Sequence, residues 1–159
     1  MLPNARAHRR LKILFVVSTG GHLTQLLALR PWWQEHDRQW VTFDHPHAHA
    51  SLEGEDVTFA YSPTTRNIPN AVRNLFLARK VLARSAPDLV VSTGAGVAVP
   101  FFWLARAKGI RSLYIEVIDR IDTRTMTGRM VYPTVDAFAV QWPEQQRLYP
   151  GSVVVGATL

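Results

Sequence analysis

Short apolar runs alternate with segments of helical spacing along most of this chain. Residues 12–17 and 89–92 are rich in β-branched side chains, which is typical of strands buried on both faces of a parallel sheet. Strands that alternate with helices across short loops indicate a doubly wound sheet, so we expect a single Rossmann-like α/β domain. The predicted strands are 12–17, 39–43, 56–60, 89–92, 111–115, 135–140 and 152–155, and the predicted helices are 22–35, 70–85 and 98–108.

The chain is long enough for one domain with a core of its own. Of its 159 residues, 47% are apolar and 19% are charged, which excludes disorder as the main state. Neither an internal repeat nor a linker divides it, so we expect a basic leader over 1–11 and one domain over 12–159. Because the chain has no cysteine, disulfides, thiolate zinc sites and cysteine nucleophiles are excluded.

The sequence shows neither a candidate membrane-spanning segment nor a secretory signal. The longest apolar run, 94–105, is interrupted by Pro100 and is shorter than the roughly 18–20 residues that span a bilayer. The apolar run that follows the basic start, 13–17, is too short for a secretory signal. We therefore expect a cytoplasmic protein.

The charge balance is basic, with 18 Lys and Arg residues against 12 Asp and Glu residues and a net charge of +6. Fifteen of the 18 cations are arginines, whose planar guanidinium binds phosphate through two hydrogen bonds. Such a balance fits nucleic acid, an anionic membrane surface or a phosphorylated substrate, and it also fits an ordinary solvated surface.

Two glycine-containing loops follow predicted strands, at 18–22 and at 92–96. In a doubly wound sheet, ligands bind outside the carboxyl ends of the strands, where both loops lie. Gly20 and Gly21 allow close approach of the backbone, and the helix that follows favours an anion such as phosphate. The alternative is a tight turn without a ligand, since neither a dinucleotide fingerprint nor a Walker loop is present.

His22 and Glu116 are the candidate acid–base residues. The His22 imidazole lies in the first turn of a predicted helix at the crevice, where it is placed for general-base work. Glu116 ends a predicted strand, with Asp119 and Asp122 just beyond, and can bind a hydroxyl group or act as a base. The alternatives are a structural histidine and a solvated loop acid.

Three histidines alternate at positions 45, 47 and 49, a spacing that places three imidazoles on one face of an extended segment. Pro46 and the polar flanking residues instead indicate an exposed loop. We therefore expect no metal site here.

The predicted helix 70–85 combines an apolar stripe with basic residues. A basic amphipathic helix can lie on an anionic lipid surface, and the alternative is an ordinary surface helix packed on the sheet. Trp32 and Trp33 are either an interfacial anchor or part of the core. The stripe consists of Val72, Leu75, Phe76, Val81 and Leu82, and the candidate membrane residues are Arg73, Arg79, Lys80 and Arg84.

Several motifs resemble those of MurG-type GT-B glycosyltransferases. Residues 18–23 (STGGHL) resemble the first glycine loop, where Thr-Gly-Gly-His opens the acceptor domain, and residues 90–100 (VVSTGAGVAVP) resemble the second. Residues 110–116 are similar to the strand that ends in His-Glu-Gln-Asn, of which only Glu116 matches here. Residues 149–156 are similar to the strand before the interdomain linker.

This resemblance covers nearly the whole chain, yet GT-B enzymes have two Rossmann-like domains and one is present here. The chain therefore resembles the split GT-B family, which includes bacterial PssD-like and CpsF-like proteins and the eukaryotic subunit that recruits the catalytic partner in N-glycan assembly. The resemblance implies the acceptor-binding and membrane-binding subunit of a two-component glycosyltransferase. A separate PssE-like subunit would supply most of the donor site in a hetero-oligomer.

The implied reaction moves a sugar from a UDP-sugar to a polyprenyl-diphosphate-linked acceptor in polysaccharide or glycan biosynthesis. The implied place is peripheral, on the inner face of the cytoplasmic membrane. The transfer needs no metal and no cofactor, and His22 is the first candidate for the base, with Glu116 the second. Arginines would neutralise the acceptor diphosphate. The implied substrate-binding residues are Ser18, Thr19, Gly20, Gly21, Thr93, Gly94 and Gly96.

Two other classes of function stay open on the residues alone. A self-sufficient sugar-nucleotide enzyme, such as a hydrolase or oxidoreductase, would bind a nucleotide tightly without a second protein. A nucleic-acid-binding domain is supported only by the positive charge. The logarithm of its affinity for DNA or RNA would fall linearly with the logarithm of the salt concentration. Because no nucleic-acid-binding motif is present, we expect no nucleic-acid partner.

Overall fold

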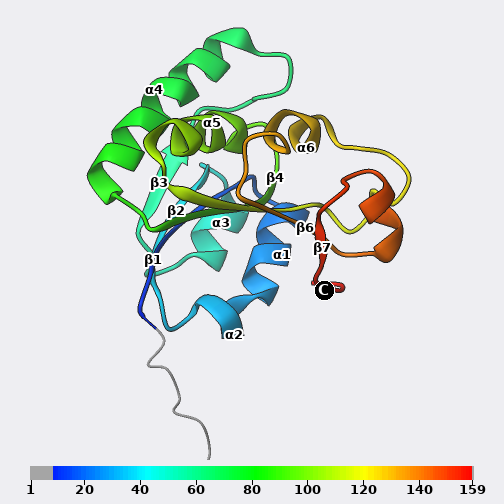
Figure 1. The fold of residues 1–159 in the computed structure, drawn as a ribbon. Helices are drawn as coiled ribbons and strands as arrows, with labels where there is room; N and C mark the ends of the chain where they lie inside the picture. The colour runs from blue at the N-terminus through cyan, green and yellow to red at the C-terminus, as the bar shows by residue number, and fades with distance from the viewer. Residues whose placement is uncertain (1–8, 159) are drawn as a thin grey trace, which may run out of the picture.

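Seven parallel strands form one sheet in the order β3-β2-β1-β4-β5-β6-β7. The computed structural model describes residues 9–158, so residues 1–8 of the predicted leader lie outside the described part (Figure 1). The strand order reverses between β1 and β4, as in doubly wound sheets, which confirms the predicted fold class. The strands are β1 (Lys12–Val17), β2 (Asp37–Phe43), β3 (Val57–Ala60), β4 (Leu89–Gly94), β5 (Arg111–Ile115), β6 (Ala137–Val140) and β7 (Val153–Val154).

Helices cover both faces of this sheet (Figure 1). Strand β1 shows why: Leu14 and Val16 join the core on the α4–α5 side, while Phe15 and Val17 join the core on the α1–α2 side. Apolar side chains on both faces of one strand require a helical layer on each side. The helices are α1 (Gly21–Ala28), α2 (Arg30–Trp33), α3 (Pro46–Ser51), α4 (Ile68–Ser85), α5 (Ala98–Lys108), α6 (Met126–Val131) and the short 3₁₀ helix η1 (Pro143–Arg147).

Prolines account for two departures from the predicted elements. The predicted helix 22–35 is divided into α1 and α2 at Leu29, because Pro31 has no N–H to donate to the preceding turn. The predicted loop around His45 contains helix α3, in which Pro46 occupies the first turn and the His45 side chain accepts a hydrogen bond from the backbone N–H of His47. Trp33 is buried, and its indole N–H donates to the Leu26 carbonyl at 2.8 Å, so this tryptophan belongs to the core.

Helix α4 packs on the sheet with a different face from the one predicted. The buried positions of its first two turns are Asn70 and Asn74, whose side-chain amides bond the backbone of the loop before the helix. Asn74 both donates to the Tyr61 carbonyl and accepts from the Tyr61 N–H, each at 2.9 Å. Of the predicted stripe, Val81 and Leu82 are buried, whereas Val72, Leu75 and Phe76 face outward.

Arg38 and Glu55 join strand β2 to the turn before β3. Arg38 donates two hydrogen bonds to the Glu55 carboxylate, at 3.0 and 2.7 Å, and the Trp40 indole N–H donates a third at 3.0 Å. The Arg38 hydrogen bonds lower the pKa of Glu55, against the opposing effect of partial burial, and the Trp40 bond adds to the lowering. The pair is mostly enclosed, since the two side chains are 23% and 19% exposed.

We predict that Glu55→Gln lowers the free energy of unfolding by about 1–2 kcal/mol at pH 7, because a two-bond pair is lost at a partly solvated site. The folded carboxyl has a lower pKa than the unfolded one, so the pair stabilises the fold above the ordinary value of about 4.3. That stabilisation disappears as the pH falls through the lower folded value. Urea unfolding between pH 7 and pH 3 measures both effects.

The matched control is Arg10→Met, which removes the exposed ion pair between Arg10 and Asp37. We expect it to change the free energy of unfolding by less than about 0.5 kcal/mol. Equal losses in the two variants, or a Glu55→Gln deficit that persists at pH 3, would contradict the prediction.

Candidate functional site

Both glycine loops lie at the carboxyl ends of the neighbouring strands β1 and β4. Val17, the last residue of β1, is paired with Gly94, the last residue of β4. The strand order reverses at this pair, so α1 and α5 leave the sheet on opposite faces, with one glycine loop before each helix. The sequence predicted this convergence, and the structure brings the two loops together.

His22 is held against the second glycine loop by two reciprocal hydrogen bonds. Its Nδ1 lies 3.0 Å from the Thr93 carbonyl oxygen, and the Thr93 hydroxyl donates to the His22 carbonyl at 2.6 Å. A carbonyl oxygen only accepts, so we assign the ring proton to Nδ1, which leaves Nε2 with its lone pair. The half-buried imidazole therefore has the nitrogen that a general base needs.

His47 of helix α3 contacts the first glycine loop. Gly20 has a φ of +79°, and its backbone N–H donates to His47 Nδ1 at 3.1 Å. One amide predicted to bind substrate is thus already bonded within the chain. Sequence reasoning considered His47 only as a metal ligand, because nothing local indicates that α3 reaches the first glycine loop.

The other histidines of the run make separate contacts. His45 caps α3, and His49 pairs with Asp44 at 2.7 Å, so the three imidazoles have three different partners. Across residues 9–158, no three histidine or acidic side chains gather in a way that could hold a metal ion.

The second glycine loop uses most of its polar groups internally. Thr93 is fully buried, and the Gly94 N–H donates to the Ser92 hydroxyl at 2.9 Å. Gly96 is exposed, and a Cβ placed on it would lie 3.3 Å from the Thr64 hydroxyl. Of the predicted substrate-binding residues in this loop, Gly96 is thus the one on the surface. Ser18 and Thr19 are half-buried at the end of β1.

Glu116 is completely buried inside a hydrogen-bond network. Its carboxylate accepts from the Val117 N–H at 3.0 Å, from the Thr125 hydroxyl at 3.0 and 3.1 Å, and from the Tyr149 hydroxyl. Burial, and then the hydrogen bond to Glu116, raise the pKa of Tyr149, so this phenol stays protonated and donates. The geometry favours a structural role for Glu116, which fixes the loop after β5, and a base role stays a prediction.

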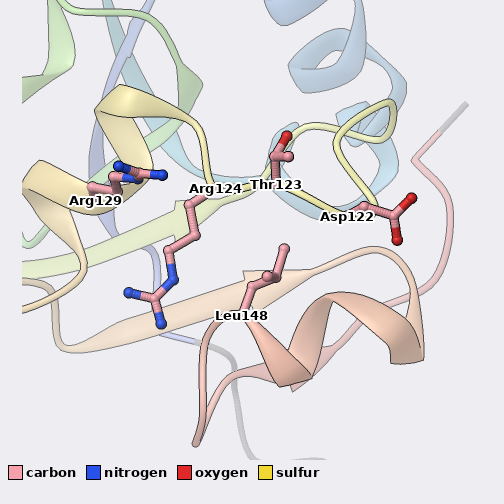
Figure 2. A pocket seen from close by; sticks show the side chains of 5 residues that line it. All are labelled: Asp122, Thr123, Arg124, Arg129 and Leu148. Atoms are coloured by element: carbon pink, nitrogen blue, oxygen red, sulfur yellow. The ribbon is translucent and has the colours of Figure 1, made fainter.

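A third polar feature lies on the loop that Glu116 holds. Asp122, Thr123, Arg124, Arg129 and Leu148 line an open depression of about 550 Å³. Figure 2 shows the two guanidinium groups on one side and the Asp122 carboxylate on the other. Arg124 lies over the rings of two tyrosines, with centroid distances of 5.3 and 5.9 Å, which orients its side chain. The sequence signalled this site only through its arginine-rich composition.

Comparisons with known proteins identify a family and several relatives. The family described as "Oligosaccharide biosynthesis protein Alg14 like" matches residues 57–158. The human UDP-N-acetylglucosamine transferase subunit ALG14 is 30% identical, with 92% of this chain and 82% of the human protein aligned. The mouse protein of the same name is 26% identical over the same shares.

Solved structures that match this fold are about twice as long. MurG of Acinetobacter baumannii superposes with a TM-score of 0.73 at 19% identity, covering 92% of this chain and 45% of MurG. UDP-N-acetylglucosamine 2-epimerase of Rickettsia bellii superposes with a TM-score of 0.76 at 14% identity, covering 94% of this chain and 45% of the epimerase. The chain thus has the fold of one half, the N-terminal half, of a GT-B enzyme.

We predict that Tyr149→Phe lowers the free energy of unfolding by about 1–3 kcal/mol, because the buried Glu116 carboxylate loses a hydrogen-bond donor. Tyr132→Phe is the control: its hydroxyl donates to the Pro150 carbonyl at an exposed position, so we expect a loss below about 1 kcal/mol. Denaturant unfolding of the two variants measures the difference. Equal stability of the two would show that the carboxylate does not depend on Tyr149.

Proposed function

Because this chain belongs to the Alg14-like family of oligosaccharide biosynthesis proteins, we propose that it is a subunit of a UDP-N-acetylglucosamine transferase. The main support for this proposal is the match to this family over residues 57–158, which are 102 of the 150 described residues. The fold supports the same conclusion, since one Rossmann-like half with two glycine loops corresponds to one side of a GT-B cleft. A second subunit with the donor-binding half completes the enzyme.

The acceptor in this proposal is a polyprenyl-diphosphate-linked sugar, as in the split PssD-like and CpsF-like systems. The depression at Arg124 and Arg129 supports it, because two guanidinium groups on one side can bind the oxygens of a diphosphate. Asp122, on the opposite side, can accept hydrogen bonds from sugar hydroxyls. The loop that carries Asp122 and Arg124 follows the carboxyl end of β5, on the same edge of the sheet from which the glycine loops leave.

His22 is the proposed general base. Its Nε2 accepts the proton of the acceptor hydroxyl while the hydroxyl oxygen bonds to the anomeric carbon of the donor sugar. The bond between that carbon and the phosphate oxygen breaks, and UDP leaves with the electron pair. The hydrogen bond from Nδ1–H to the Thr93 carbonyl keeps the ring oriented as its charge increases.

Helix α4 is the proposed membrane-binding element, at the inner face of the cytoplasmic membrane. Ile68 and Phe76 are 77% and 67% exposed, unusual values for large apolar side chains in a folded domain. Trp103 of α5 and Met126 of α6 are also exposed. Helices α5 and α6 lie on the same side of the sheet as α4 (Figure 1). No helix within residues 9–158 has the length and apolarity to cross a bilayer. The basic side chains of this helix are Arg73, Arg79, Lys80 and Arg84.

The proposed function predicts that the purified chain has negligible transferase activity and gains it with a donor-domain subunit. The assay measures transfer of N-acetylglucosamine from UDP-GlcNAc to a polyprenyl-diphosphate-linked acceptor. In the assembled enzyme, His22→Ala lowers kcat by about 10²-fold or more, the usual contribution of a positioned base. His49→Ala is the control and leaves kcat unchanged, since His49 of α3 pairs with Asp44, which precedes the helix.

Three outcomes would contradict this proposal. Full turnover by the chain alone would remove the need for a second subunit. Unchanged kcat in His22→Ala would remove His22 from the reaction. Tight UDP-sugar binding without a partner would favour a self-sufficient sugar-nucleotide enzyme.

The membrane proposal predicts that replacing Arg73, Arg79, Lys80 and Arg84 by Gln releases the chain from anionic liposomes. Each cation near an anionic surface contributes on the order of 1 kcal/mol, and salt screens this attraction. Replacing Ile68 and Phe76 by Ser weakens binding at both low and high salt, because it removes apolar contact. Co-sedimentation at two salt concentrations measures the bound fraction.

A second quadruple variant controls for net charge. Replacing Lys12, Lys108, Arg111 and Arg147 by Gln removes the same charge from other exposed positions. We expect this variant to sediment with anionic liposomes nearly as the unmodified chain does. If the α4 variant and the control bind equally, α4 is not the membrane-binding element.

A further inference from the structure

Gly94 lies where a side chain would collide with the His22 ring. A Cβ built on Gly94 would be 2.7 Å from His22 Cε1 and 2.8 Å from Nδ1, closer than Cβ atoms come to other heavy atoms. The Tyr114 hydroxyl lies 3.4 Å from the same point, so the ring and the phenol enclose it. By contrast, a Cβ on Gly20 or Gly109 would meet no heavy atom within 4 Å.

The backbone of this loop is also engaged with His22. The Thr93 carbonyl accepts from the His22 ring, the buried Thr93 hydroxyl donates to the His22 carbonyl, and the Gly94 N–H donates to Ser92. Gly94 has a φ of +134°, a conformation in which glycine is strongly favoured. None of these polar groups of Thr93 and Gly94 is directed at a ligand in this arrangement.

We infer that Thr93 and Gly94 are positioning residues that hold the His22 imidazole in one tautomer and one orientation. The sequence suggested that they bind phosphate or sugar. The structure instead places the edge of the His22 ring where a side chain at residue 94 would begin, with Nδ1 bonded to the Thr93 carbonyl and the Tyr114 hydroxyl near the same point. The ring fits there because residue 94 has no side chain, and with the proton on Nδ1 the lone pair is on Nε2. The catalytic purpose of this arrangement rests on the proposed function, whereas the arrangement itself does not.

A double-mutant cycle in thermal unfolding tests the contact without any activity assay. Gly94→Ala costs backbone strain in every background, but it adds overpacking only where the His22 ring is present. We therefore expect Gly94→Ala to lower Tm by at least about 3 °C more in the unmodified chain than in His22→Ala. Folding of Gly94→Ala only in the His22→Ala background would be the same result in a stronger form.

Gly109→Ala is the matched control, because Gly109 has a φ of +68° and open space around its Cβ position. Its Tm loss should be equal in the two backgrounds. Equal losses for Gly94→Ala in the two backgrounds would overturn the inference, because the ring and residue 94 would then be independent.

Nuclear magnetic resonance of ¹⁵N-labelled histidine tests the tautomer in the unmodified chain. We expect His22 to carry its proton on Nδ1 with Nε2 bare in the neutral ring, and a proton on Nε2 would overturn the inference.

The assembled enzyme separates a positioning role from a phosphate-binding role. A positioning role predicts that Gly94→Ala lowers kcat about as much as His22→Ala, leaves the acceptor KM within about twofold, and adds nothing in the double variant. A raised KM with unchanged kcat would mean that the loop binds substrate, and would overturn the inference. If no combination of subunits shows transferase activity, the proposed function fails, while the unfolding cycle still decides whether residue 94 accommodates the ring.

Discussion

Strand β1 pairs with β2 on one side and with β4 on the other. The chain leaves β1 and β4 towards opposite faces of the sheet. With right-handed connections, the helices that follow two neighbouring parallel strands leave on opposite faces only where the strand order reverses, here between β1 and β4. Elsewhere in the sheet, successive helices lie on the same face. The pairing of Val17 with Gly94 brings α1 against the end of β4. The contacts of His22 with Thr93 therefore depend on where two strands end.

The sequence is most informative where the local pattern and the tertiary environment agree. Residues 12–17 and 89–94 are central strands with helices on both sides, so their apolar runs are easy to interpret. The glycine loops follow from the same strands, because the carboxyl ends of parallel strands share one edge. His22 could be selected as a candidate base from its place at the start of a helix, although its tautomer could not, since Thr93 is 71 residues away.

Other features depend on tertiary contacts that the local pattern does not reveal. Glu116 has the sequence position of a site carboxylate, yet Tyr149, 33 residues later, closes over it from the end of η1. Gln141 donates to Gln25 of α1 and accepts from the Thr158 N–H, and no periodicity in the sequence indicates that buried network. The depression at Arg124 likewise depends on two tyrosine rings brought together by folding. Local propensity carries no information on such distant partners.

Helix α4 is tied to the loop before it through Asn70 and Asn74 in its first turns, and this choice of residues limits how the helix can move. A helix seated on leucines can roll about its axis by tens of degrees at small cost, since dispersion contacts have little direction. Amide hydrogen bonds are directional, so a comparable roll of α4 would break the bonds to Tyr61 and Pro63 together. These hydrogen bonds therefore fix the rotation of α4 about its own axis. As a result, the exposed side chains of Ile68 and Phe76 are held in one direction relative to the rest of the domain.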